Sequence, residues 1–307
     1  MALTVKQLDN VGVEVTGFDI RKPVTAELRS ELISLWNAHG ILLFRNQDID
    51  PKAQIEFSRV FGPLENHPLK ATTSDEFPEL FTLVNDPVKE KYMTASYKGK
   101  NIVSKLDWHM DLHYTGKPNR GAILRSVVVA KEEGKTGFGD LAKAYAALDE
   151  KTKTLLEKLE VVYSFNMQRR HMRFVDLEGY EPGAYSPKKP SDMQFPSFPE
   201  IAYPAVVTHP VTGQKVLEIV EQMLDRFVAP HKAGLSNDEA IDLMQSLVEH
   251  TRKPEFHYFH AWRDGDMILW DNWRAMHCTT GTAPGVARVI HRTTIMGDTM
   301  LGRVLEP

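Results

Sequence analysis

The chain has 307 residues and a formal charge of -4, from 37 Lys and Arg against 41 Asp and Glu. This charge and a pI near 6.3 exclude the strongly basic surface by which proteins hold nucleic acid or an anionic membrane. With 42% hydrophobic residues and no apolar run near the roughly 20 residues of a membrane span, the composition is that of a soluble globular protein.

The single cysteine, Cys278, excludes an intrachain disulfide and a multi-cysteine metal centre. One free thiol is typical of a reducing compartment, which would also keep iron ferrous. The first ten residues, MALTVKQLDN, lack the basic start and apolar core of a signal peptide. We therefore expect a cytoplasmic protein.

The amino-terminal residues predict a strand followed by a helix. Residues 12–20, VGVEVTGFD, alternate loosely between apolar and polar side chains, which is typical of a strand or hairpin. Residues 24–38 predict a helix that Thr25 caps and Gly40 ends. Its apolar stripe, at helical spacing, consists of Leu28, Leu32, Leu35 and Trp36.

A buried strand and a second helix follow. Residues 41–44, ILLF, predict the strand. Asp50 precedes a proline and begins the helix, which ends near Gly62. Residues 85–107 are polar and predict a mobile loop ahead of the first candidate ligands.

The middle of the chain mixes strand and helix. Residues 122–130 predict a β-branched strand, and residues 140–159 predict a helix. Residues 169–204 are rich in Pro, Lys and Tyr and predict a long loop or lid, because strand-like segments resume after it. Residues 220–227 and 237–251 predict two further helices.

The chain ends in three predicted strands, at residues 255–262, 266–270 and 288–296. Strands at both ends with helices inserted between them predict one β-sandwich or jelly roll wrapped by helices. We therefore expect a single domain over residues 1–307, with lid loops near 85–107 and 166–204.

Trp108-His109-Met110-Asp111 and the distant His277 supply two imidazoles and one carboxylate. His109 and Asp111 are two residues apart, so on an extended strand they point to the same side and can bind one ion. His277, just past a predicted apolar strand, is a candidate third ligand at the rim of the sheet. This donor set holds Fe(II) on one face and leaves the other face open for a cosubstrate and oxygen. Together the three residues predict a non-haem iron oxygenase.

The histidines have alternative roles. A buried, hydrogen-bonded role is the alternative for His109 itself. His113 is four residues from His109, a spacing that zinc ligands use on a helix, but no Glu lies between them and a strand fits better. His257 and His260 predict packing or support of the ligands, and His39 is expected to interact with the end of its helix.

The neighbours of His277 leave two questions open. Cys278 adjoins it, which suggests a nucleophilic dyad, but no orienting partner is evident in the sequence. Asp271-Asn272 is either a pair that fixes His277 or a simple turn.

Two arginines complete the set of candidates. Arg288 and Arg292 share one face of a predicted strand. A guanidinium matches a carboxylate with two parallel hydrogen bonds, and a buried charge without a partner is costly. Three roles are open for the two residues. They could form structural salt bridges, they could be exposed charges on an edge strand, or they could bind two anions, of which one is a cosubstrate and the other a substrate. The iron motif favours the last interpretation.

In their order along the chain, these motifs resemble the taurine dioxygenase / 2,4-dichlorophenoxyacetate dioxygenase family of Fe(II)- and 2-oxoglutarate-dependent enzymes. The resemblance covers most of the sequence. It rests on GILLFR at 40–45, FGPL at 61–64, WHMD at 108–111, GKT at 134–136, AYAAL at 144–148, THPVTG at 208–213, GD at 265–266, WDN at 270–272 and RVIHRTTIMGD at 288–298.

By that resemblance His109, Asp111 and His277 are the iron ligands. It also implies that Thr136 and Arg288 hold the distal carboxylate of 2-oxoglutarate.

The resemblance further implies where the substrate binds. Arg292 would contact its acidic group. His67 resembles a substrate-binding histidine of the taurine enzymes, and Lys70 resembles a lysine near the substrate of the phenoxyacetate enzymes. Tyr114 falls where the taurine enzymes place a pocket aromatic.

Some features depart from the family pattern. Gly-Lys precedes Thr136 where two glycines are usual, and Trp273 replaces the commoner Arg, although Arg274 follows it. The segment before Trp108 is long, and the region 166–204 is divergent. These loops shape the pocket in the family, so they leave the substrate open. Candidates in them for a lid contact, or simply for solvated surface, are Arg169, Arg170, Arg173 and Tyr185.

The resemblance implies a mainly β fold, with a double-stranded β-helix (jelly-roll) core flanked by α-helices, and the cofactors Fe(II), 2-oxoglutarate and O2. It implies hydroxylation of a small anionic organic acid, of aryloxyalkanoate or sulfonate type, with release of succinate and CO2. An alcohol formed beside the ether oxygen or sulfonate then collapses with C–O or C–S cleavage. Family members are often dimers or tetramers, so a homo-oligomer is expected, without nucleic-acid or membrane partners.

Three other functions fit parts of the pattern. A biosynthetic hydroxylase or desaturase of an amino acid or natural-product acid would use the same iron site. A cupin-like metal-binding protein without catalysis would not need the paired arginines or Thr136. A zinc hydrolase accepts two His and one Asp, and its insensitivity to oxygen would separate it. Asp111 argues against a halogenase, which leaves that ligand position vacant for halide.

Overall fold

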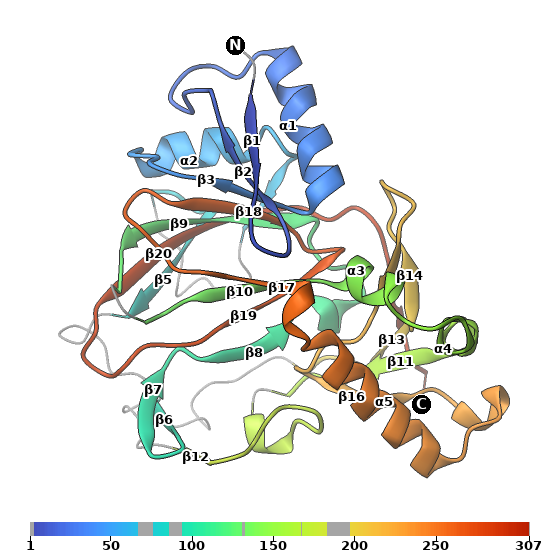
Figure 1. Ribbon diagram of the computed structural model, residues 1–307. Helices are drawn as coiled ribbons and strands as arrows, with labels where there is room; N and C mark the ends of the chain where they lie inside the picture. The colour runs from blue at the N-terminus through green and yellow to red at the C-terminus, as the bar shows by residue number, and fades with distance from the viewer. Residues whose placement is uncertain are drawn as a thin grey trace.

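The computed structural model describes residues 3–66, 76–85, 94–130, 133–166, 168–182 and 197–306. These residues form a β-rich fold with few helices (Figure 1). The helices are α1 (Ala26–His39), α2 (Pro51–Ser58), α3 (Leu141–Ala146), α4 (Glu150–Leu156) and α5 (Asn237–Thr251). Within the described part of the chain, no helix has the length and apolar character needed to cross a membrane.

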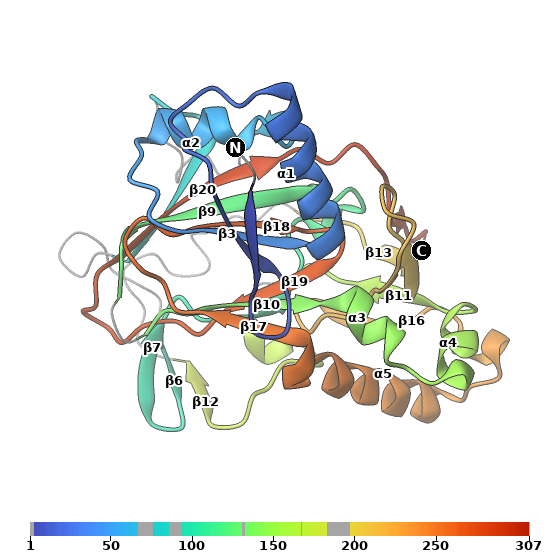
Figure 2. The same ribbon diagram turned by 45° about the horizontal axis from the view of Figure 1, so that its top comes forward.

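The largest sheet lies beneath α1 and α2 (Figures 1 and 2). Its strands are, in spatial order, β1 (Thr4–Gln7), β2 (Val13–Thr16), β3 (Ile41–Phe44), β18 (Met267–Asp271), β9 (Gly121–Val128), β20 (Arg288–Ile295) and β4 (Leu64–Glu65), with β5 (Leu80–Asn85) also paired to β20. The β2–β3 pair is parallel, and the other pairs are antiparallel.

A smaller sheet faces the largest one. Its strands are, in order, β17 (His257–His260), β10 (Thr136–Asp140), β19 (Ala275–Thr279) and β8 (Leu106–His109). Phe138 and Ala275 of the small sheet belong to one apolar cluster with Ile268, Trp270 and Ile290 of the large sheet. One layer of the core therefore lies between the two sheets, and side chains on their facing sides share its interior.

Three further groups of strands complete the described structure. They are β16 (Leu224–Phe227), β11 (Glu160–Tyr163), β13 (Ile201–Pro204) and β21 (Arg303–Val304); then β12 (Tyr180–Pro182), β6 (Thr94–Tyr97) and β7 (Lys100–Val103); and the pair β14 (Val206–Thr208) and β15 (Lys215–Leu217).

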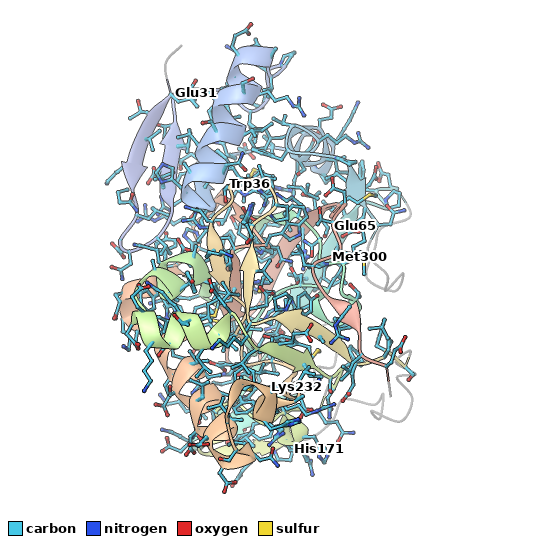
Figure 3. The ribbon with its side chains drawn as sticks, turned by 90° about the vertical axis from the view of Figure 1, so that its right-hand side faces the viewer. Glu31, Trp36, Glu65, His171, Lys232 and Met300 are labelled. Atoms are coloured by element: carbon cyan, nitrogen blue, oxygen red, sulfur yellow. The ribbon has the colours of Figure 1, made fainter. Side chains whose placement is uncertain are left out.

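Helix α1 follows the sequence prediction closely. The Thr25 side chain accepts a hydrogen bond from Leu28 N at 3.3 Å, and Gly40 ends the helix with φ 71°, a left-handed conformation that glycine adopts without strain. Trp36 points from α1 toward the large sheet (Figure 3). A Cβ on Gly121 would lie 2.6 Å from the Trp36 ring, so only glycine allows this close approach.

Arg274 ties the end of α1 to the small sheet. Its Nη2 lies 2.7 Å from Asp140 Oδ2, and its Nη1 donates to Ala38 O at 3.0 Å. Both charged side chains are buried. Since removal of one partner from such a pair costs about 3–5 kcal/mol, this arginine has a structural task, although it adjoins the position where the family usually carries one.

Several other predicted elements are confirmed, with ends shifted by a few residues. The buried strand at 41–44 is β3, and the predicted second helix is α2, capped by Asp50, which accepts from Ala53 N at 2.7 Å. The other elements in this group are β2, β9, β17, β18, β20 and α5.

Two predicted helices are wrong in part or in whole. Residues 140–159 form two helices, because the Asp149 side chain accepts from Thr152 N and begins α4 as a new helix. Residues 220–227 form no helix: Met223 has φ 65°, which a right-handed helix excludes, and β16 pairs with β11. Here tertiary pairing outweighed the apolar spacing.

The loop predicted over 85–107 is also wrong for its described residues, 94–107. They form the hairpin β6–β7 and the start of β8. Lys98 and Gly99, both with positive φ, make the two-residue turn that suits the strand twist. In the second predicted loop, η3 (Arg169–His171), β12 and β13 interrupt an otherwise irregular path, and residues 167 and 183–196 lie outside the described ranges.

Candidate metal centre

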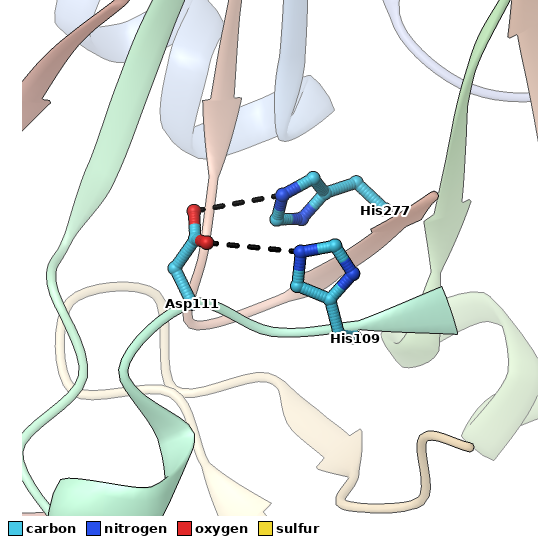
Figure 4. Close-up of side chains that lie close together, drawn as sticks. All are labelled: His109, Asp111 and His277. Carbon is cyan, nitrogen blue, oxygen red and sulfur yellow. Dashed lines mark ion pairs between the residues drawn. The ribbon is translucent and has the colours of Figure 1, made fainter. Parts of the chain in front are cut away.

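His109, Asp111 and His277 come together between the two sheets (Figure 4). One potential ligand atom from each lies within 4.8 Å of the others. Asp111 Oδ1 is 3.8 Å from His109 Nε2, and Asp111 Oδ2 is 3.5 Å from His277 Nε2. Donors about 2.0–2.2 Å from one metal, at right angles, would lie about 3 Å apart, so a small contraction would bring these atoms onto an ion.

Strand pairing places the two imidazoles. His277 on β19 is directly opposite His109 on β8. Opposite residues of an antiparallel pair project to the same face, and the two ring centroids are 4.1 Å apart. His277 therefore lies inside a strand, and the predicted rim position just past an apolar strand is wrong.

The histidines are in the chemical state that a metal requires. His109 Nδ1 lies 2.8 Å from the carbonyl oxygen of Asp107, which fixes the proton on Nδ1 and leaves the Nε2 lone pair free. Burial lowers the pKa of His277 well below its usual value, so this ring is a neutral imidazole, as a metal ligand must be.

Arg292 compensates the charge of Asp111. Its Nη2 lies 2.7 Å from Asp111 Oδ2, and its guanidinium lies 5.5 Å from the Trp270 ring centroid. Burial alone would raise the pKa of Asp111, but the guanidinium of Arg292 beside it outweighs burial and holds this pKa well below its ordinary value. The carboxylate is therefore ionised at neutral pH and available to a cation.

Asn272 forms two hydrogen bonds with the backbone of Asp111. Its Oδ1 accepts from Asp111 N at 2.9 Å, and its Nδ2 donates to Asp111 O at 3.0 Å. Asp271 lies elsewhere, paired with Arg120 and 3.0 Å from His209 Nε2. Neither residue contacts His277 in the described hydrogen bonds. Of the two alternatives for Asp271-Asn272, the structure therefore shows the turn, which Trp273 N closes by donating to Asp271 Oδ1 at 3.0 Å, while Asn272 also orients the carboxylate of Asp111.

Substitution of Asn272 by alanine should therefore weaken the metal site without removing a ligand. Partners that orient a ligand typically contribute about 10–100-fold to metal affinity, and we expect a loss in that range for Mn(II), measured by titration of the apo protein. Asn101→Ala, at an exposed strand position, is the control. Unchanged affinity in a folded N272A protein would contradict the role of Asn272.

Arg288 marks a second polar position on the inner face of β20. It is buried, burial lowers its pKa to about 10, and no described carboxylate forms an ion pair with it. Because it stays protonated at neutral pH, it is a charged group suited to an anionic ligand. Gly134 leaves space beside it, since a Cβ there would lie 3.0 Å from Arg288 Cδ.

Thr136 lies two residues beyond Gly134, at the start of β10. Its Oγ1 accepts a hydrogen bond from Trp262 Nε1 at 2.9 Å. Because a hydroxyl also carries one proton, Thr136 retains a donor for a further acceptor. Thr136 therefore has a hydroxyl proton to offer, on the strand that begins two residues after Gly134.

Tyr114 lies three residues after Asp111, in the short helix η2 (His113–Thr115). Its ring is 4.7 Å from both Phe165 and Phe198, whose own centroids are 4.8 Å apart. Burial raises the pKa of Tyr114, so its hydroxyl stays protonated. The three rings form an aromatic group beside the metal ligands. The other two predicted substrate contacts, His67 and Lys70, lie outside the described residues.

Three of the other histidines, His113, His257 and His260, have structural partners. His113 Nε2 lies 3.0 Å from buried Glu218, His260 Nε2 lies 2.9 Å from Asp266, and His257 Nε2 lies 2.6 Å from the carbonyl of Thr251. Burial raises the pKa of Cys278 to about 12, which leaves it a neutral thiol and a poor nucleophile.

Residues 4–294 match the family described as "Taurine catabolism dioxygenase TauD, TfdA family". The chain belongs to this family. It is therefore an Fe(II)- and 2-oxoglutarate-dependent dioxygenase that uses molecular oxygen, as its sequence motifs predicted.

Named TauD/TfdA relatives span almost the whole chain. An alpha-ketoglutarate-dependent 2,4-dichlorophenoxyacetate dioxygenase of Cupriavidus pinatubonensis is 28% identical over 94% of this chain and 95% of its own length. An alpha-ketoglutarate-dependent sulfate ester dioxygenase of Pseudomonas putida is 25% identical over 95% of this chain and 88% of its own.

Solved structures agree on the fold. The structure of AAD-2 in complex with Mn(II) and N-oxalylglycine has a TM-score of 0.72 and 26% identity, and covers 98% of this chain and 100% of that one. A taurine dioxygenase from Burkholderia xenovorans has a TM-score of 0.75 and 22% identity, with 99% and 97% covered.

Proposed function

We propose that His109, Asp111 and His277 hold the Fe(II) of this dioxygenase. The observation that carries the assignment is the convergence within 4.8 Å of two imidazoles, from β8 and β19, and of the carboxylate of Asp111, from the turn after β8. This donor set suits Fe(II) and leaves coordination positions open. Bound iron would supply the oxygen activation that oxidises a substrate C–H bond, and the protein residues would orient the reactants around it.

We further propose that Thr136 and Arg288 bind the distal carboxylate of 2-oxoglutarate. Arg288 would supply a guanidinium that no described acid neutralises, and Thr136 a hydroxyl proton. In the overall reaction one oxygen atom enters the hydroxylated substrate and the other enters succinate, with release of CO2. A cosubstrate fixed at its far end by these two residues would present its oxoacid end to the metal.

The proposed substrate is a small organic acid of the aryloxyalkanoate or sulfonate type. Arg292 is positioned beside the metal ligands to bind its acidic group, once a metal ion replaces Arg292 as the partner of Asp111. The aromatic group of Tyr114, Phe165 and Phe198 offers an apolar wall beside this anion site. The names of relatives include both 2,4-dichlorophenoxyacetate and sulfate ester dioxygenases, which supports this class. Hydroxylation beside the ether oxygen or sulfonate would end in C–O or C–S cleavage.

The proposed architecture is one domain over residues 1–307 with a jelly-roll core. Two facing sheets with the active site between them, and helices on the outside, support it (Figure 2). Assembly as a dimer or tetramer stays a prediction from the family.

A substrate panel tests this function. Anaerobic protein with Fe(II) and 2-oxoglutarate should show a charge-transfer absorption band, and the true substrate class should shift it. The panel contains aryloxyalkanoates, alkylsulfonates, sulfate esters and, for comparison, amino acids. Air should then yield succinate and cleaved product in equal amounts with the active compound. Absence of the band at saturating Fe(II) and 2-oxoglutarate would refute the site assignment, and a response to amino acids alone would refute the substrate class.

A further inference from the structure

A nearly buried arginine joins the β12–β6–β7 sheet to the strand that carries His109. The side chain of Arg169 is 11% exposed, and its Nη2 lies 2.8 Å from Asp107 Oδ1. Its Nη1 donates to the hydroxyl of Tyr97, and its Nη2 also donates to the carbonyl of Asp176. A guanidinium with this many partners is held in one orientation.

Two tyrosines enclose this guanidinium. Tyr97 on β6 is paired directly with Tyr180 on β12, and their rings are 5.4 Å apart. Arg169 Cζ is 4.9 Å from the first ring centroid and 5.1 Å from the second, within the range of a cation–π interaction. Arg169 thus binds the β12–β6–β7 sheet through the faces of these two rings as well as through hydrogen bonds.

Asp107 transmits this anchoring to the metal centre. Arg169 and Lys105 hold its carboxylate, the latter at 3.0 Å, while its carbonyl oxygen accepts the Nδ1 proton of His109 at 2.8 Å. The backbone of Asp107 therefore sets the rotation of the His109 ring. A shift of this residue would turn Nε2 away from Asp111.

The β12–β6–β7 sheet also contacts the side of the site where 2-oxoglutarate is predicted to bind. Val103, at the end of β7, exchanges two backbone hydrogen bonds with Thr282, of 2.9 and 3.0 Å. A Cβ on Gly134 would lie 3.0 Å from both Thr282 and Arg288. The sheet is therefore fixed at two points, one beside each half of the site.

We propose that Arg169 is a positioning residue for the metal, acting through Asp107 on His109. This inference rests on the proposed function of His109 as a ligand. Arg169 touches neither metal nor substrate; it holds the Asp107 carbonyl where the imidazole needs it. Within the predicted loop 166–204, Arg169 reaches the strand that carries His109. Arg173, in the same loop, instead pairs with Asp225 at the surface.

Binding of Mn(II) to the apo protein, followed by electron paramagnetic resonance, tests the proposal without turnover. Arg169→Gln and Asp107→Asn should each weaken Mn(II) binding by about 10- to 100-fold, as loss of a partner that orients a ligand does. The double variant should bind Mn(II) no more weakly than the single variant with the larger loss of affinity, because both substitutions interrupt the same Arg169–Asp107 contact. Arg173→Gln is the matched control and should bind Mn(II) like the wild type.

A second readout separates positioning from general loosening of the fold. At saturating Fe(II), R169Q should keep a KM for 2-oxoglutarate close to that of the wild type, while the Mn(II) affinity stays reduced. Hydrogen exchange should rise in residues 94–103 and 168–182. If exchange rises there but Mn(II) affinity changes less than twofold, Arg169 has a structural role only and the proposal is overturned.

Failure of the proposed metal site and failure of a variant to fold can both be told apart from failure of this proposal. A wild-type protein that does not bind Mn(II) would refute the proposed metal site itself, whatever the variants do. If R169Q does not fold, Tyr97→Phe removes only one hydrogen bond to the guanidinium. It should still weaken Mn(II) binding measurably, and wild-type affinity in that variant would overturn the proposal.

Discussion

Replacement of Asp111 by alanine is expected to abolish succinate formation and to weaken Mn(II) binding by more than about 100-fold. Loss of a partner that merely orients a ligand costs up to that factor, and Asp111 is the only carboxylate among the three proposed ligands. The measurement is metal content after desalting, together with succinate formed at saturating Fe(II) and 2-oxoglutarate.

The D111A protein also loses the partner of Arg292, which would then be buried with an uncompensated charge. Removal of one member of a buried pair costs about 3–5 kcal/mol, so a thermal melt must show that the variant is folded. Asp111→Asn, which keeps the size of the side chain, is the second variant. Asp242→Asn, exposed on α5, is the control. A folded D111A protein that still forms succinate near the wild-type rate would contradict the ligand assignment.

Arg288→Gln is expected to raise the dissociation constant of 2-oxoglutarate at least about 30-fold. Truncation of one partner in a buried, hydrogen-bonded charge pair costs about 2–5 kcal/mol, and 2 kcal/mol corresponds to that factor. The dissociation constant can be measured by titration of the Mn(II)-loaded protein under anaerobic conditions. Arg59→Gln, in an exposed ion pair with Glu79, should leave it unchanged.

The same variant should have the opposite effect on the protein without ligand. Because Arg288 is buried and no described acid compensates it, its replacement removes a cost of burial, and the free energy of unfolding should stay equal or rise. In the wild type, 2-oxoglutarate at 100 times its dissociation constant should add about 2.7 kcal/mol of stability. R288Q should gain almost none at that concentration. A loss of more than 2 kcal/mol in ligand-free R288Q would instead assign Arg288 a structural role.

The sequence predicted the composition of the metal centre better than the strand that supplies its third ligand. His109 and Asp111 were expected to share one face of an extended strand, but β8 ends at His109, and Asp111 lies in the turn that follows, where Asn272 holds its backbone. For His277 the flanking residues gave no alternation, since Ala275, Met276, His277 and Cys278 are all buried. A strand covered on both faces has no period-2 pattern to recognise.

Two other errors show how pairing partners decide local structure. Leu224 and Phe227 have the spacing of a helix face, but both are buried where β16 pairs with β11, an interaction between distant residues. The polar segment of β6 and β7 offers no apolar pattern, and its stability depends on Arg169 and the tyrosines around it. The residues near β16 in the sequence do not indicate that it pairs with β11, and those near β6 and β7 do not indicate their contact with Arg169.

Because the two proposed histidine ligands lie on β8 and β19, metal binding depends on the correct pairing of these two strands. Since His109 and His277 face each other across the ladder, displacement of either strand by one position would turn one imidazole to the opposite side of the sheet. A metal ion bound to both rings would therefore stabilise only the native strand register and none of the shifted registers. Chelation during refolding should therefore yield misaligned, inactive molecules that later addition of metal rescues only slowly.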